Sequence, residues 1–125
     1  MPDKSLSDNS LDDFLAGKSM LTQELFMHFI EQFQKIGPVM IYPAKSMIGI
    51  ATSRKRIAWV TQLGKNFVHV VFPFEIPYND NLCFQKIAKV PGDDKQFNHH
   101  FRMLAKKDMN DEVRKFMQIA YAKGS

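Results

Sequence analysis

The sequence predicts a single α+β domain in which helices cover mainly one face of an antiparallel β-sheet. Helical periodicity occurs at both ends of the chain, short β-branched and aromatic runs lie between, and turn residues separate those runs. The chain has 125 residues, of which 45% are hydrophobic and 24% charged, so it can bury one core. We expect residues 1–10 to be a flexible lead-in and residues 11–123 to form the domain.

A short helix is expected first. Ser10 and Asp13 have the spacing of a helix start, because a side-chain oxygen can accept from free amides and a carboxylate suits the first turn. The helix, residues 11–16, is expected to end at Gly17.

A longer helix is expected over residues 20–36, capped by Ser19. Gly37 in a left-handed conformation and Pro38 should end it. Its apolar residues recur at helical spacing, which predicts one buried stripe: Leu21, Leu25, Phe29, Phe33 and Ile36.

Strand-like runs follow the second helix, separated by two segments of hairpin length, 53–56 and 63–66. They predict an antiparallel meander and occupy residues 39–42, 47–52, 57–62 and 67–74. Turn residues dominate residues 75–94, where residues 84–88 are either a short strand or a helical turn.

A final strand is expected over residues 96–104, followed by a capped helix start at residues 108–111. Gly124 is expected to stop this closing helix. Its apolar stripe consists of Val113, Phe116, Met117, Ala120 and Tyr121.

The sequence motifs that usually indicate nucleotide binding, serine-hydrolase catalysis and zinc-dependent proteolysis are absent. The sequence lacks the glycine-rich phosphate-binding strings, the nucleophile-elbow string and the HExxH zinc string. Cys83 is the only cysteine, so neither an internal disulfide nor a thiolate cluster is expected. The polar amino terminus does not resemble a signal peptide, and the longest apolar run is too short to span a bilayer. We expect a cytoplasmic protein without a cofactor or a membrane partner.

A metal site is not expected either. Glu24, His28 and Glu31 fall on one helix face, but sites of this kind draw ligands from several helices, so a solvated face is the favoured interpretation. His99 and His100 are adjacent on a strand and should point to opposite faces, where they do not chelate one ion.

Strand alternation selects a candidate ligand-binding surface. Val68, Val70, Phe72 and Phe74 form a wholly apolar set that should face the helices, so His69 should point to the other face. Phe97, Phe101 and Met103 predict the same division in the last strand, with His100 and Arg102 on the outer side.

Further residues are expected at this surface. Trp59 lies on the middle strand and adds an aromatic plane, although its neighbours do not fix its face. Lys45 and a basic patch formed by Arg54, Lys55 and Arg56 could rim the site. Cations, imidazoles and an aromatic plane together are typical of sites for anions and bases. The alternative is that Trp59 belongs to the core, the histidines bind backbone groups and the basic turn is merely solvated.

Four short motifs carry a family resemblance: Phe14–Lys18, Gly37–Val39, His99–Arg102 and Ala120–Tyr121. Together they resemble a bacterial family of uncharacterised domains, domain of unknown function family 5655, from about Leu11 to Lys123. The resemblance implies a small intracellular bacterial domain. The resemblance implies no particular catalytic residues, and the basic turn is not a feature of the family.

The favoured function is a non-enzymatic binding module for an anionic or aromatic ligand, nucleic acid among them. The net charge is +4, and residues 35–106 hold eleven Lys or Arg against four Asp or Glu. Two alternatives stay open: an accessory subunit that pairs through a sheet edge, and a small enzyme that uses His100 as general acid or base with Arg102 holding an anionic substrate. The sequence leaves the oligomeric state undetermined.

Overall fold

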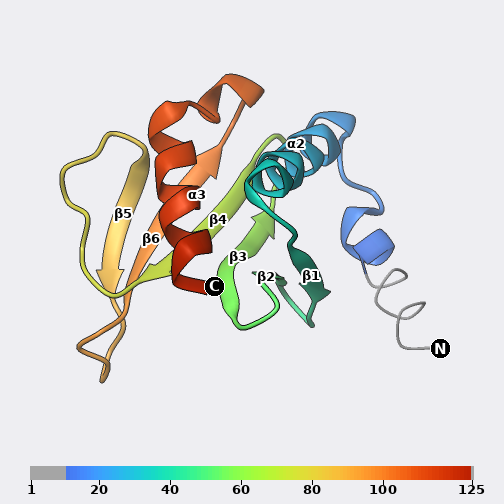
Figure 1. Ribbon diagram of the computed structural model, residues 1–125. Helices are drawn as coiled ribbons and strands as arrows, with labels where there is room; N and C mark the ends of the chain where they lie inside the picture. The colour runs from blue at the N-terminus through green and yellow to red at the C-terminus, as the bar shows by residue number, and fades with distance from the viewer. Residues whose placement is uncertain (1–10, 125) are drawn as a thin grey trace.

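A computed structural model describes residues 11–124 of the chain (Figure 1). The helices are a helical segment at residues 11–15, α2 (Met20–Ile36), the 3-10 turn η1 (Lys106–Asp108) and α3 (Asp111–Gly124). The strands are β1 (Met40–Pro43), β2 (Ile48–Ala51), β3 (Arg56–Leu63), β4 (Val68–Phe74), β5 (Phe84–Lys89) and β6 (Phe97–Met103). The predicted α+β class is confirmed. The predicted helix start at Ser10 lies outside the described residues.

The six strands form one antiparallel sheet in the order β1-β2-β3-β4-β6-β5. The first four strands follow one another as a meander. The sheet then departs from a simple meander, because β6 pairs with β4 and residues 84–89 form a strand at the far edge. The segment whose structure the sequence left open is therefore β5.

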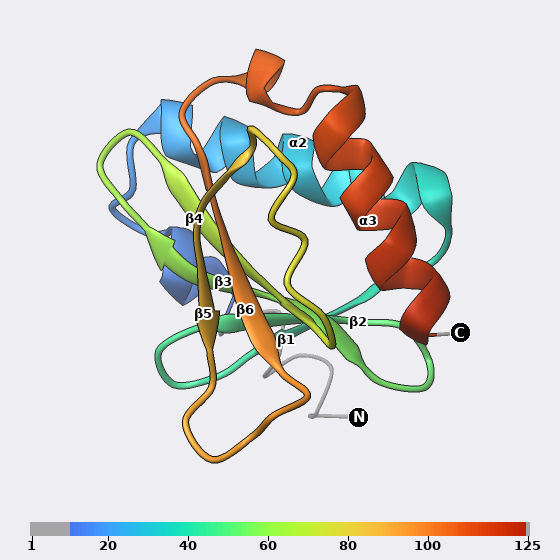
Figure 2. The ribbon, with the colours of Figure 1, turned by 90° about the vertical axis from the view of Figure 1, so that its left-hand side faces the viewer.

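The helices α2 and α3 cover one face of this strongly twisted sheet (Figure 2). The apolar side chains of β4 and β6 turn towards them, as the alternation predicts: Val68, Val70, Phe72, Phe74, Phe101 and Met103 are buried. We refer to the opposite side of the sheet as the outer face. No helix among residues 11–124 combines the length and apolar character that crossing a membrane requires.

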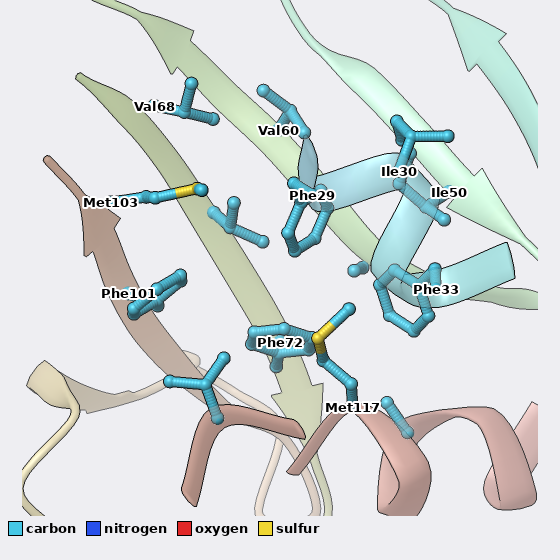
Figure 3. Packing of buried hydrophobic residues seen from close by; sticks show 14 of the residues in the cluster. Phe29, Ile30, Phe33, Ile50, Val60, Val68, Phe72, Phe101, Met103 and Met117 are labelled. Atoms are coloured by element: carbon cyan, nitrogen blue, oxygen red, sulfur yellow. The ribbon is translucent and has the colours of Figure 1, made fainter. Parts of the chain in front are cut away.

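The core between the sheet and the helices combines aromatic rings with aliphatic and methionine side chains (Figure 3). Phe29 and Phe33 of α2 meet edge to face, with ring centroids 5.3 Å apart. Phe33 also approaches Phe72 of β4, and Phe116 of α3 approaches Phe74. The phenylalanines predicted to be core residues are therefore buried, and they join both helices to one strand.

The two ends of α2 illustrate how the sequence sets its bounds. Ser19 caps the start as predicted, because its hydroxyl accepts from the Thr22 amide at 3.1 Å. Gly37 follows the end, but its φ of 173° is extended, so the predicted left-handed cap is wrong. The need for glycine is steric, because a Cβ at Gly37 would overlap the Tyr121 ring, whose hydroxyl donates to the Pro38 carbonyl at 3.0 Å.

The closing helix α3 starts where the sequence predicts. The Asn110 side chain accepts from the Val113 amide at 3.0 Å and supplies the cap. The helix includes Gly124 instead of stopping before it. The Thr52 hydroxyl donates to the Gly124 carbonyl at 2.6 Å, so the end of α3 is fixed to the turn between β2 and β3.

Candidate functional site

Strand pairing places six residues in one line across the outer face. Residues directly opposite each other in an antiparallel sheet point to the same side. Following the register from β1 to β5 gives what we call the outer row: Tyr42, Gly49, Trp59, Val71, His100 and Lys86. Since neighbouring strands lie about 4.8 Å apart, this row spans roughly 24 Å.

The outer face is one-sided in charge. The six strands contain Arg56, Lys86, Lys89 and Arg102 but no aspartate or glutamate. The carboxylates of the described residues lie in helices and connections instead. The strands therefore present a positive, carboxylate-free surface, which favours anionic ligands.

One end of the outer row is a stack of rings and a cation. The Arg56 guanidinium lies 5.0 Å from the centroid of Trp59 and 5.6 Å from that of Tyr42. Gly49 lies between the two rings, where a Cβ would come within 3.2 Å of Trp59 and 3.3 Å of Arg56. The missing side chain at Gly49 thus leaves room for the Arg56 side chain, whose guanidinium lies over the two rings.

A directional chain of hydrogen bonds lies beside the middle of the row. The Arg102 Nε–H donates to His69 Nδ1 at 3.4 Å, and His69 Nε2 lies 2.9 Å from His100 Nδ1. Because Arg102 only donates, His69 must carry its proton on Nε2 and donate it towards His100 Nδ1. His100 then carries its proton on Nε2, which has no hydrogen-bond partner among residues 11–124. The chain thus ends in an unused donor.

Both of these histidines favour the neutral form. Burial lowers the pKa of His69, and the nearby His100 and Arg102 lower that pKa further. Burial also lowers the pKa of His100, with a contribution from Lys86. A bound anion would oppose these effects, so anion binding should raise both pKa values.

His99 has a different, structural role on the opposite side of β6. It is 0% exposed among the rings of Phe74, Tyr78 and Phe84. The Tyr78 amide donates to His99 Nε2 at 3.0 Å, so Nδ1 carries the proton and donates to the Phe97 carbonyl at 2.8 Å. The neutral ring thereby ties the connection between β4 and β5 to the core, and it does not belong to the outer site.

We expect the fold to lose stability below about pH 6.5. Burial lowers the pKa values of His28, His69 and His100, and the most deeply buried histidine of the described residues is His99. Burial lowers its pKa in the folded state from the ordinary value of 6.5. Between these two values the unfolded chain binds more protons, so the free energy of unfolding falls as the pH decreases through this window. Urea midpoints at pH 7.5 and pH 5.5, both above the usual carboxyl range, measure the loss.

The matched variants for this experiment are His99→Gln and His28→Gln. The glutamine amide introduced by His99→Gln can both accept and donate but does not titrate, so this variant should reduce the dependence of the midpoint on pH. His28 lies half-buried on α2, so His28→Gln should leave most of that dependence in place. An unchanged dependence in His99→Gln would show that another group causes the loss.

The remaining predicted site residues, Lys45 and the basic turn, line hollows. Lys45 belongs to the connection between β1 and β2, where it lines a hollow with Asp13 and Phe14. The basic turn lies at the start of β3 and lines a second hollow. His69 and His100 line neither of these two hollows.

Sequence reasoning missed four contributors to the outer face: Tyr42, Gly49, Phe67 and Lys86. The Phe67 ring lies 4.2 Å from the Arg102 guanidinium and supports it. Tyr42, Gly49 and Lys86 belong to strands whose faces become known only from the pairing. The carboxylate-free strands, in contrast, could have been noticed in the sequence, once strand ranges were assigned.

The chemistry open to the site is binding and proton exchange. Among residues 11–124, no group of three or more His, Cys, Asp or Glu side chains could hold a metal ion. Burial raises the pKa of Cys83 to about 12, so this side chain is a thiol at neutral pH and not an activated nucleophile. The neutral His100 can donate one hydrogen bond and accept a proton on Nδ1 when its bond to His69 opens.

Comparisons with family models, with curated proteins and with solved structures gave no match. The family resemblance carried by the four short motifs therefore stays an expectation, and the geometry of the outer face is the basis for a functional proposal.

Proposed function

We propose that this domain binds single-stranded nucleic acid along the outer row. One observation carries the proposal: the pairing register aligns two aromatic rings, an imidazole and a lysine across a face whose strands have no carboxylate. From the sequence, we also propose that the domain acts in the bacterial cytoplasm and belongs to domain of unknown function family 5655.

The two kinds of group on this face match the two parts of a nucleotide. Bases of any sequence stack on aromatic rings, which contributes about 1–3 kcal/mol per base. The Arg56 guanidinium lies over the rings of Tyr42 and Trp59 and, because it is planar, offers a base a further surface on which to stack. Phosphates would be neutralised by Arg56, Lys86 and Arg102, and no strand carboxylate opposes them. The length of the row accommodates several nucleotides.

The histidine pair adds a dependence on pH to this proposal. His100 Nε2–H offers a donor beside Lys86 at any pH, and a protonated pair would add positive charge. Binding should therefore tighten as the pH decreases towards the lowered pKa values, and the bound strand should raise the pKa of His69 and His100.

Titration with a short oligothymidylate tests the proposal through the fluorescence of Trp59, the only tryptophan. We expect quenching, because a base stacks on the indole ring. Because three outer-face cations would neutralise phosphates, a plot of the logarithm of the binding constant against the logarithm of the salt concentration should have a slope of about −2. Histidine signals followed by NMR should report the rise in pKa.

A blunt-ended duplex of the same sequence content is the control, since its bases are already stacked and paired. It should quench Trp59 far less than the single strand does. Equal quenching by both would contradict stacking on the outer row, and the absence of binding at low salt with micromolar protein would remove nucleic acid as the ligand.

A further inference from the structure

A hollow of about 420 Å³ adjoins the aromatic end of the outer row. Its lining is the basic turn together with neighbouring residues of β1 and β2: Tyr42, Ala51, Thr52, Ser53, Arg54, Lys55 and Arg56. Three of these side chains are cationic and none is acidic. Tyr42 and Arg56 belong both to the hollow and to the ring stack, so one ligand can occupy the two places together.

The turn that carries these cations is held in place by its own hydrogen bonds. The Arg54 and Lys55 amides donate to the Thr52 hydroxyl oxygen at 3.2 and 3.3 Å. That hydroxyl donates in turn to the Gly124 carbonyl at the end of α3. These two backbone amides are therefore used within the turn, and recognition in the hollow falls mainly to the Arg54, Lys55 and Arg56 side chains.

Nearby carboxylates do little to reduce this positive charge. Glu75 is close enough to Lys55 for that lysine to help lower its pKa. The main cause of the lowered pKa is Lys123, whose Nζ donates to the Glu75 carboxylate at 3.1 Å. Since Glu75 already has a cationic partner, the three cations of the hollow remain available for an external anion.

We propose that this hollow binds the terminal phosphate of a strand whose first base stacks on the adjoining rings. A terminal phosphate monoester carries close to two negative charges at neutral pH, as a phosphorylated side chain does, whereas an internal phosphodiester carries one. Three cations around one hollow therefore select the end of a strand over its interior. The site fixes which end of the bound strand lies at β1. This inference rests on the proposed function.

The test compares three oligothymidylates of equal length, with a 5′-phosphate, with a 3′-phosphate and with hydroxyls at both ends. One terminal phosphate should tighten binding about tenfold at low salt, because one more charge is neutralised, and the phosphate at the other end should have a much smaller effect. The variant Arg54→Ser/Lys55→Ser should lose this advantage and keep its affinity for the unphosphorylated strand, since Arg56 remains in the stack.

Lys106→Ser/Lys107→Ser is the matched control, because it removes the same charge from the exposed turn η1. This control variant should still bind the strand with the favoured terminal phosphate more tightly than the strand without a phosphate. Equal affinities for all three strands, or an advantage that survives in Arg54→Ser/Lys55→Ser, would overturn the terminal-phosphate site and leave binding along the outer row intact. Failure of every strand to bind would overturn both proposals.

Discussion

Phe72→Ala is expected to lower the free energy of unfolding by about 3–5 kcal/mol, because it empties the centre of an aromatic core. Phe72 is 0% exposed. Its ring centroid lies 6.4 Å from that of Phe33, 5.8 Å from Phe74 and 6.1 Å from Phe84. The substitution therefore removes contacts that join α2, β4 and β5. Equilibrium urea denaturation at neutral pH measures the change.

Tyr42→Ala is the control, because it also removes a ring but from the exposed outer face. It should change the free energy of unfolding by less than about 1 kcal/mol. An unchanged midpoint for Phe72→Ala would mean that the two faces of β4 are assigned the wrong way round, and the histidine site would then lie beneath the helices.

The fold was largely predictable because each element carries a local signal. The cap at Ser19 and the alternation in β4 are properties of neighbouring residues, and the structure confirms them. The predicted stripe of α2 is only partly confirmed: Leu25, Phe29 and Phe33 are buried, whereas Leu21 at the start of the helix is 41% exposed and Ile36 at its end is partly buried. The position of β5 was not predictable, since insertion of β6 between β4 and β5 depends on long-range pairing. The role of Gly37 was misjudged for the same reason: Tyr121, far along the chain in α3, occupies the space a side chain would need.

The candidate site was predictable only in part. Alternation alone places His69, His100 and Arg102 on one face, because β4 and β6 pair without a shift in register. Trp59 could not be assigned in this way. The register of β3 against β4 shifts between Val60 and Gln62, so simple alternation fails along β3. Lys45, which the sequence offers as a residue at the rim of the site, lines a hollow with Asp13.

The triple variant Arg56→Ser/Lys86→Ser/Arg102→Ser is expected to weaken binding of single-stranded oligothymidylate on the order of 100-fold at about 50 mM salt. Each lost cation removes the release of counterions from one phosphate. The salt dependence should therefore flatten, with the slope becoming less negative by about 2. Thermal unfolding should show that the variant remains folded, because all three side chains lie outside the core.

The matched control is Lys35→Ser/Lys106→Ser/Lys107→Ser, which removes the same charge from exposed positions on α2 and η1. Attraction by net charge alone would weaken equally in the two variants. If the outer face recognises the strand, only the Arg56→Ser/Lys86→Ser/Arg102→Ser variant should bind it more weakly.

The most direct measurement is a titration of both triple variants with the same oligothymidylate over a range of salt concentrations. The outer row predicts that the control variant binds nearly as the unmodified chain does, whereas the outer-face variant loses most of its affinity and its salt dependence. Equal affinities and equal slopes for the two variants would contradict binding along the outer face.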